Sequence, residues 1–490
     1  MTLDQWPPAG PSEFIIPRSD PVQLFDACVV QVTMKHLLFL LAISIPTLSG
    51  AAQPNIIFLL SDDQHWNETS VQMHPEYANS KNSDYQTPHL EALASEGMRF
   101  SAAYAPAPVC SPTRASIQTG LSPATLHWCK AGPPVSASGN YKLLPPSSRK
   151  SLEKEQTFAG FLQQAGYATA HFGKWHIGGG GPESRGYDVS DGDIGNEAAA
   201  KFKDSNPVDI VGMTTRAGEF MQQQVMSKKP FYLQMSYLAL HQPGNASQKN
   251  IARFTKMHPE MKQRSVQRMA LTADLDDGVG ALLDKIKKLK IENDTYVIYM
   301  SDNGAGGRGN ALIKGGKGSL DEGGTRAVFI VRGPGVPENS WSHQRIVGYD
   351  LFPTFCSLAG VKGALPSNLE GGDLTKLFKG KQTSVERSQP GLLFHFPHYQ
   401  TSTPVSALYH DDYKLVRDYE SGLDHLYAIT TDIAEKNDLS ATEPQILQLM
   451  QKMLSQQLTS TNATIPQKNP NYDPSKPTTA IKRGKPRRRK

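Results

Sequence analysis

Two short apolar segments, far apart in the chain, each end in a pair of oxygen-bearing side chains. Such segments, bounded by polar residues, are typical of parallel strands covered on both faces. Ligand-binding side chains of open α/β sheets gather at the carboxyl ends of such strands. Three carboxylates and one carboxamide there predict a site for a hard cation such as Ca²⁺ or Mg²⁺. The pairs are Asp62-Asp63, after residues 55–61, and Asp302-Asn303, after residues 296–301. The alternative is that both loops are merely acidic.

Apolar strands and helical stretches alternate over most of the chain. This alternation predicts an α/β fold, in which a large, mostly parallel sheet is flanked by helices. A chain of 490 residues exceeds one ordinary core, so a smaller second domain is expected. Further strands are predicted at 167–172, 231–240 and 327–332, and helices at 156–166 and 268–289. We assign residues 53–385 to the main domain and 386–460 to a small C-terminal α+β domain.

A cysteine stands at the start of another predicted helix, where residues 110–120 read CSPTRASIQTG. Proline is tolerated in a first helical turn, as at Pro112. A helix N-terminus carries unpaired N–H groups and partial positive charge, which favour anions and lower a thiol pKa. The alternative is a structural cysteine in a turn. The C-x-P-x-R spacing of Cys110 and Arg114 is more specific than a lone cysteine.

Four basic residues follow predicted strands or lie in a glycine-rich turn. Lys174 and His176 are two residues apart after one strand, and His241 directly follows another. Lys317 lies in the segment KGGKGS, whose glycines allow close backbone approach. Single lysines are commonly solvated and single histidines commonly structural. Their shared place at strand ends nevertheless indicates one pocket.

These motifs resemble the type I sulfatases of the alkaline phosphatase superfamily over residues 53–460. In that family the signature cysteine is oxidised to formylglycine before folding, so the resemblance implies this for Cys110, with a formylglycine-generating enzyme as partner. It also implies an alkaline-phosphatase-like fold and one Ca²⁺, with Mg²⁺ as the alternative. The implied metal ligands are Asp62, Asp63, Asp302, Asn303 and the modified Cys110. Other matching segments are Gly173-Lys174-Trp175-His176, His241, and Lys317 with Glu322-Gly323-Gly324-Thr325-Arg326.

The same resemblance assigns roles to the basic residues. Arg114 and Lys174 hold the formylglycine, His176 hydrogen-bonds its hydroxyl, and Lys174, His241 and Lys317 bind the sulfate. A hydroxyl of the hydrated aldehyde attacks sulfur, and His241 or Lys317 protonates the leaving alcohol. The second hydroxyl then expels sulfate and restores the aldehyde. A cation and lysines neutralise the oxygens during transfer.

We therefore predict an exported sulfuric ester hydrolase that acts on a sulfated carbohydrate. The first rival is a phosphomonoester or phosphonate hydrolase of the same superfamily. The second is a non-catalytic protein that binds polyanions through its basic C-terminal tail. We expect no nucleic-acid partner. We also expect no membrane span, because no segment is apolar enough to cross a bilayer.

Both ends of the chain differ in character from the body. Residues 34–52 read as a signal peptide, with a basic start, the apolar segment 37–45 and small residues before Gln53. Residues 1–33 are then a mis-assigned extension, and the protein is periplasmic or secreted. The alternative is a genuine leader with an internal apolar helix.

Residues 461–490 are expected to form a disordered tail. Without the seven basic residues of 482–490, the net charge of +5 becomes −2.

Two further expectations concern single side chains. Cys129 and Cys356 could pair in an oxidising compartment, but Cys356 lies in an apolar helical stretch, which favours a free packed thiol. His398, in the segment HFPHY, is a candidate sugar-binding residue at the pocket rim. The alternative is that this segment is a strand of the C-terminal sheet with its aromatic side chains in the domain interface.

Overall fold

The computed structural model describes residues 53–134, 139–242, 244–306 and 312–478. The predicted extension and signal peptide (1–52) lie outside the described residues, as do residues 479–490, which include the basic segment 482–490. None of the described helices is both long and apolar enough to span a membrane.

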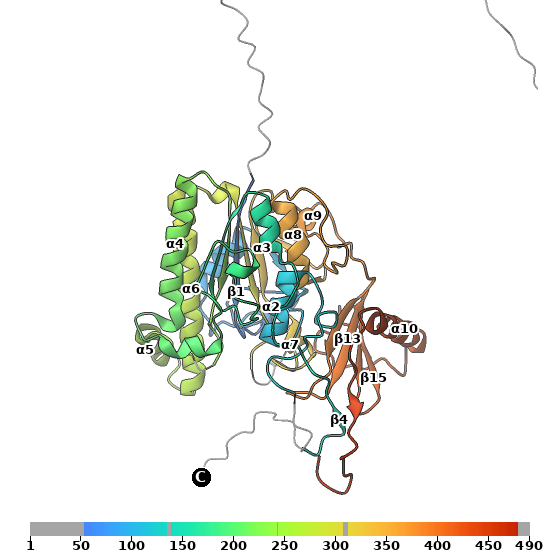
Figure 1. The fold of residues 1–490 in the computed structure, drawn as a ribbon. Coiled ribbons are helices and arrows are strands. Elements are labelled where there is room, and N and C mark those ends of the chain that lie inside the picture. The colour runs from blue at the N-terminus through green and yellow to red at the C-terminus, as the bar shows by residue number, and fades with distance from the viewer. Residues whose placement is uncertain (1–52, 135–138, 243, 307–311, 479–490) are drawn as a thin grey trace, which may run out of the picture. The chain divides into compact units, whose positions relative to one another are not determined.

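A sheet forms the centre of the main domain (Figure 1). It has eight strands, in the order β10-β2-β9-β8-β1-β7-β5-β6. Within the described residues, β9 is the strand that runs against its neighbours, and the other pairings are parallel. The predicted mostly parallel sheet is confirmed. The strands are β1 (Asn55–Ser61), β2 (Met98–Phe100), β5 (Ala168–Gly173), β6 (Val189–Ser190), β7 (Phe231–Ser236), β8 (Thr295–Ser301), β9 (Phe329–Arg332) and β10 (Ser340–Ser342).

Strand register brings the predicted site residues to one edge of this sheet. Ser61, the last residue of β1, pairs with Ser301, the last residue of β8. On the other side of β1, Leu60 pairs with Ser236 of β7, which in turn pairs with Gly173 of β5. The loops that follow these four strands therefore leave the sheet side by side.

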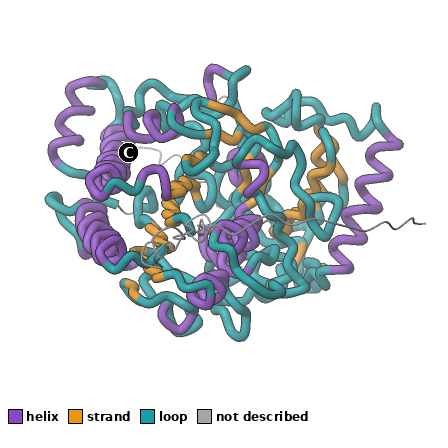
Figure 2. Tube along the Cα trace, turned by 90° about the horizontal axis from the view of Figure 1, so that it is seen from above, coloured by secondary structure: helices purple, strands orange, loops and turns teal. Residues whose placement is uncertain are grey.

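Helices cover both faces of the sheet, as the view from above shows (Figure 2). The side chains of β1 alternate between two cores: Ile57 and Leu59 pack with α1, α4 and α6, whereas Phe58 packs with α3 and α8. The helices of the main domain are α1 (Pro88–Ser95), α2 (Cys110–Thr119), α3 (Phe158–Gln164), α4 (Ile210–Met226), α5 (Gln248–Met257), α6 (Gln263–Leu289), α7 (Glu322–Thr325), α8 (Leu351–Leu358) and α9 (Thr375–Phe378).

The C-terminal part forms an antiparallel sheet, β12-β13-β14-β15, with α10 on one face. Its other face packs on the main domain, where Phe394 of β12 lies 5.9 Å from the ring of Tyr104. The small C-terminal α+β domain is thus confirmed. The strand alternative for the segment HFPHY holds for His395 and Phe396, where β12 ends. The elements are β12 (Leu392–Phe396), β13 (Val405–His410), β14 (Tyr413–Asp418), β15 (Asp424–Tyr427) and α10 (Pro444–Ser460).

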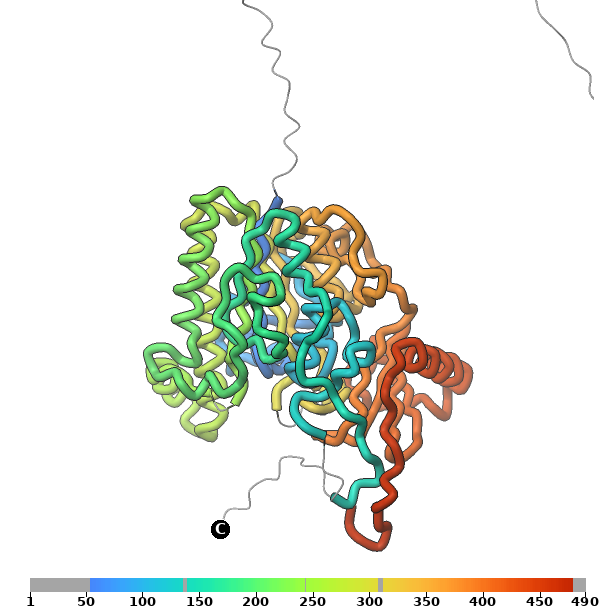
Figure 3. The backbone as a smooth tube through the Cα atoms, viewed as in Figure 1, coloured from blue at the N-terminus to red at the C-terminus, as the bar shows by residue number. Residues whose placement is uncertain are grey.

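The predicted disordered tail is corrected for residues 461–478. There β16 (Gln467–Lys468) pairs with β4 (Leu143–Leu144), and the two segments run alongside each other in Figure 3. The Asn469 side chain donates to the carbonyl of Tyr141 at 2.8 Å. Sequence composition could not show this, because the partner lies more than 300 residues away. A shorter pair joins β3 (Ala103–Tyr104) to β11 (Ile346–Val347).

Cys129 and Cys356 are both buried, free thiols. Cys356 lies in α8, as expected for a packed thiol. Burial raises the pKa of Cys356 to about 12, so this thiol stays protonated and inert.

Candidate active site

Three buried carboxylates meet where β1 and β8 end. Single oxygen atoms of Asp62, Asp63 and Asp302 all lie within 4.8 Å of one another. The backbone N–H of Asp63 donates to Asp302 Oδ1 at 3.1 Å, and Asn303 Nδ2 donates to Asp63 Oδ1 at 2.7 Å. The predicted convergence of the two acidic pairs is therefore confirmed.

This cluster fits a hard cation. Asp62 Oδ1 and Asn303 Oδ1 are buried yet have no hydrogen-bond partner among the described residues. Buried polar atoms are almost always paired, so two orphaned oxygens that belong to the predicted ligand set point to a missing partner. Oxygen donors of this type match the ligands of Ca²⁺.

Each carboxylate also has its own cationic partner. Lys174 Nζ lies 2.5 Å from Asp62 Oδ2, Arg114 Nη2 lies 2.8 Å from Asp302 Oδ2, and Lys317 Nζ lies 2.6 Å from Asp63 Oδ1. Three positive and three negative charges therefore balance. Burial and neighbouring Asp62 raise the pKa of Asp302, whereas the ion pair with Arg114 and the charge of Lys174 favour its ionised form. Burial acts against the charge of Lys317, but the negative groups around it, Asp63 foremost, together outweigh burial and raise the pKa of Lys317 above its ordinary value.

Cys110 begins α2, and only 2% of its surface is exposed. Its Sγ lies 3.5 Å from His176 Nδ1, which also lies 3.2 Å from Ser111 Oγ. Burial, helped by Lys174, lowers the pKa of His176 to about 3, so this ring is neutral at pH 7. Ser111 was not among the residues predicted for the site. Cys110 Sγ is not among the clustered ligand atoms, so its role as a metal ligand stays a prediction.

Backbone geometry delivers the basic residues to the cluster. Gly173 ends β5 with φ of 91°, and a Cβ there would lie 2.2 Å from the carbonyl oxygen of Ser236, so glycine is required. Lys174 follows directly. Arg114 reaches across from α2 and donates to the Lys174 carbonyl at 2.7 Å. Gly318 donates to the Pro108 carbonyl at 2.8 Å, which holds the Lys317 loop beside the segment that precedes Cys110.

A cavity of about 670 Å³ opens onto the cluster, and its lining includes Asp63, His241 and Lys317. His241 Nε2 lies 3.9 Å from Asp63 Oδ2, and His241 Nδ1 has no partner among the described residues. Burial lowers the pKa of His241, although Asp62 and Asp63 act in the opposite direction. The predicted basic residues thus lie together with the carboxylates. Sequence analysis did not find two other lining residues, Glu68 and Arg268, because neither belongs to a motif or follows a strand.

His398 is not where we predicted. Its side chain is fully buried rather than at the pocket rim, and neither ring nitrogen has a partner among the described residues. The His398 ring instead packs 5.8 Å from that of Phe396, beside the interface core. Burial lowers its pKa to about 3. Because the domain interface covers the imidazole, it cannot offer a hydroxyl-binding edge at the rim.

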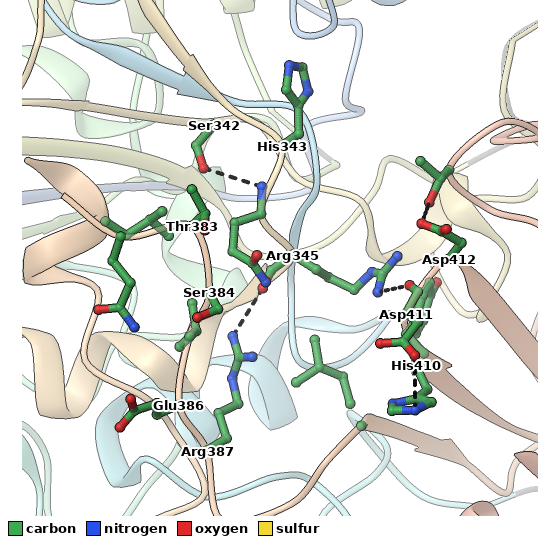
Figure 4. A pocket seen from close by; sticks show the side chains of 18 of the residues that line it. Ser342, His343, Arg345, Thr383, Ser384, Glu386, Arg387, His410, Asp411 and Asp412 are labelled. Carbon is green, nitrogen blue, oxygen red and sulfur yellow. Dashed lines mark hydrogen bonds and ion pairs between the residues drawn. The ribbon is translucent and has the colours of Figure 1, made fainter. Parts of the chain in front are cut away.

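A larger cavity, of about 980 Å³, lies elsewhere and contains none of the predicted site residues (Figure 4). His343, Arg345 and Arg387 line one side, and Asp411 and Asp412 line another. Arg345 Nη1 donates to the Asp411 carbonyl at 2.9 Å. This cavity has no nucleophile beside a cation-binding cluster, so we place the chemistry in the smaller one.

Comparison with known proteins agrees with this geometry. Residues 54–361 match the family model Sulfatase, and residues 317–464 match a model described as N-sulphoglucosamine sulphohydrolase, C-terminal. The chain belongs to the sulfatase family. It is a type I sulfatase of the alkaline phosphatase superfamily, and therefore a sulfuric ester hydrolase, as the signature predicted.

Several known sulfatases are similar along most of their length. The N-acetylgalactosamine-6-sulfatase of Sus scrofa is 30% identical over 394 residues, covering 71% of this chain and 70% of the pig enzyme. Human arylsulfatase A is 28% identical over 402 residues, covering 72% of each chain. The crystal structure of Ps i-CgsB with k-i-k-neocarrahexaose has a TM-score of 0.68 and 24% identity, over 83% of this chain and 93% of that one. This last likeness concerns the fold alone.

Proposed function

We propose that this sulfatase hydrolyses sulfate esters of a sulfated carbohydrate, with Cys110 oxidised to formylglycine and one Ca²⁺ at the carboxylate cluster. The observation that carries the proposal is the position of Cys110. It stands at the N-terminus of α2, 3.5 Å from a neutral His176, and the same helix supplies Arg114 to Asp302. One helix thus joins the residue to be modified to the acidic cluster.

Formylglycine explains why the surroundings of Cys110 are polar. The hydrated aldehyde would offer two hydroxyls: one to attack sulfur as the bond to the alcohol breaks, and a second whose loss of a proton re-forms the aldehyde as the bond from carbon to the sulfate oxygen breaks. A thiol has no second hydroxyl for the release. A neutral imidazole has one acceptor nitrogen. We assign the acceptor role to Nδ1 of His176, which can then accept a hydrogen bond from a hydroxyl group at position 110.

The charge balance of the site supports the metal. Because three acids and three bases cancel, the cluster by itself attracts no anion. A divalent cation changes the site to a net charge of +2, which suits a sulfate ester. We propose that Asp62, Asp63, Asp302 and Asn303 hold the ion. When bound, it neutralises charge on the sulfate oxygens and lowers the pKa of a coordinated hydroxyl.

The basic side chains divide the remaining work. Lys174 and Lys317 supply fixed positive charge to the sulfate oxygens. The raised pKa of Lys317 makes it hold its proton, so we assign the acid role to His241. Burial lowers the pKa of His241, so a proton placed on its imidazole is readily given up, while Asp62 and Asp63 favour the protonated ring. His241 lines the cavity from which the leaving alcohol departs, and its Nδ1 is unpaired among the described residues.

The cavity favours a sugar as the alcohol. Polar side chains line the cavity beyond the cluster, including Asn82, Asp84, Gln242 and Arg264. Hydroxyl groups of a carbohydrate can hydrogen-bond to such a lining, which a simple apolar alcohol would leave unsatisfied. The similar pig sulfatase is named for a sulfated amino sugar. We also propose export, which depends on the apolar segment 37–45, outside the described residues.

A paired assay tests this function. The purified enzyme is given one small alcohol as its sulfate ester and as its phosphate ester, and then a sulfated oligosaccharide. We expect sulfate release from the sulfate ester to exceed phosphate release, and the oligosaccharide to be hydrolysed with the higher kcat/KM. Preferential release of phosphate would instead establish the phosphoester-hydrolase alternative. Rapid turnover of aryl sulfate without turnover of any sulfated sugar would refute the substrate class.

A further inference from the structure

Arg268 of α6 lies in the wall of the active-site cavity, and its guanidinium joins two loops of the catalytic edge. Nη1 donates to the carbonyl of Leu240 at 2.6 Å, and Nη2 donates to the carbonyl of Asp63 at 2.5 Å. Leu240 directly precedes His241, so one side chain holds both the loop after β1 and the loop after β7.

The bond to Asp63 matters because of the backbone there. Asp63 has φ of 60°, in the left-handed region that residues other than glycine seldom adopt. This conformation turns the Asp63 carboxylate toward Lys317 and Asn303 while its carbonyl points to Arg268. A donor on that carbonyl therefore favours the conformation that the predicted metal ligand needs.

Glu68 in turn orients Arg268. Arg268 Nε donates to Glu68 Oε1 at 3.0 Å, and Nη2 also donates to Glu68 Oε2. Glu68 accepts two further bonds, from the backbone of His65 at 2.9 Å and from the Tyr85 hydroxyl at 3.2 Å. The carboxylate is thus held on several sides and fixes the planar guanidinium against both carbonyls.

We propose that Arg268 is a positioning residue that sets the affinity of the site for its cation, with Glu68 as its support. Arg268 acts through the backbone of Asp63 and touches neither the metal ligands' free oxygens nor Cys110. The inference depends on the proposed Ca²⁺ site. Partners of this indirect kind change metal affinity or activity by about 10–100-fold when they are removed.

The test measures Ca²⁺ binding to the metal-free full-length protein by titration calorimetry, in parallel with turnover of a small aryl sulfate. The variants are Arg268→Gln, Arg268→Lys and Glu68→Gln. The matched control is Arg417→Gln, because Arg417 forms a similar two-bond pair with Asp424, at 2.9 and 2.8 Å, in the C-terminal sheet. We expect Arg268→Gln to weaken the Kd for Ca²⁺ by about 10–100-fold, with smaller effects for the other two. The control should bind Ca²⁺ like the unaltered enzyme.

The outcomes separate this inference from the proposed function. If the unaltered protein binds no Ca²⁺, the metal site itself is refuted and the inference with it. If the unaltered protein binds Ca²⁺ and all three variants bind it equally well, only the inference is wrong. A lower melting temperature with an unchanged Kd would show that Arg268 is merely structural. Should Arg268→Gln fail to fold, the Kd values of Arg268→Lys and Glu68→Gln decide the question.

Discussion

Lys317→Met should separate catalysis from stability. Lys317 Nζ pairs with Asp63 at the cavity, where 15% of the lysine side chain is exposed. Two unit charges about 4 Å apart interact by about 4 kcal/mol at an effective dielectric of about 20. The value of kcat/KM reflects the free energy of the transition state relative to free enzyme and free substrate. Loss of the Lys317 ammonium should therefore raise that free energy by about 2.7–4 kcal/mol, which lowers kcat/KM by about 10²–10³.

The same substitution should cost little stability. Asp63 keeps its bond from Asn303 and faces the cavity, so water can solvate the carboxylate that is left. We expect a loss of about 1–2 kcal/mol in the free energy of unfolding. Lys414 is the contrasting case, since it is fully buried between Glu435 at 2.7 Å and Glu322 at 3.1 Å. Glu322 keeps its ion pair with Arg326 at 2.7 Å, but Lys414→Met takes from buried Glu435 its ion-pair partner and should therefore cost about 3–5 kcal/mol.

The assay combines urea denaturation with turnover of a small aryl sulfate. Lys314→Met is the matched control, because Lys314 lies in the same glycine-rich segment but is half exposed, with Asp321 at 3.6 Å. The control should change neither quantity appreciably, and Lys414→Met should keep most of its activity per folded molecule. If Lys317→Met kept full activity, or lost as much stability as Lys414→Met, the electrostatic reasoning would be wrong.

The remaining predictions concern modification, metal, His398 and processing. Mass spectrometry should find the peptide with Cys110 about 18 Da lighter than its thiol form, and a thiol in fully active enzyme would contradict formylglycine. Asp302→Ala or exhaustive chelation should abolish turnover, and metal-free enzyme of full activity would refute the cation site. His398→Ala removes a buried ring, so it should cost about 2–4 kcal/mol of stability and affect aryl and oligosaccharide substrates alike, whereas a selective loss on oligosaccharide would restore a sugar contact. N-terminal sequencing of exported protein should begin near Gln53, and retention of residues 20–33 would argue against the signal peptide.

Sequence reasoning succeeded where local pattern and sheet geometry act together. Apolar strands that end in polar pairs are visible in the chain itself, and parallel register forces their ends to one edge. The pattern of the chain was therefore enough to place Asp62, Asp302 and His241 together. Cys110 was found by a different signal, the spacing of a modification motif at a helix start.

Reasoning from the chain alone failed where contacts cross between distant elements. Arg268 lies within a long helix, where an arginine is ordinarily a solvated residue, and nothing local shows that it reaches the loops after β1 and β7. His398 has residue types suited to sugar binding, but its burial is decided by how the C-terminal sheet packs on the main domain. The pairing of β16 with β4 likewise depends on a partner more than 300 residues away.

The carboxylate cluster links the metal and the lysines through shared oxygens. Asp62 and Asp63 each hold a lysine and are each proposed ligands of the cation. A cation bound to these carboxylates draws on the same negative charge that now holds Lys174 and Lys317, so it weakens both ion pairs. The ammonium groups then have more of their field available to a sulfate ester in the cavity. Removing the metal ion should consequently weaken substrate binding by more than the direct attraction between the ion and the sulfate group. The reason is that Lys174 and Lys317 then pair again with the carboxylates.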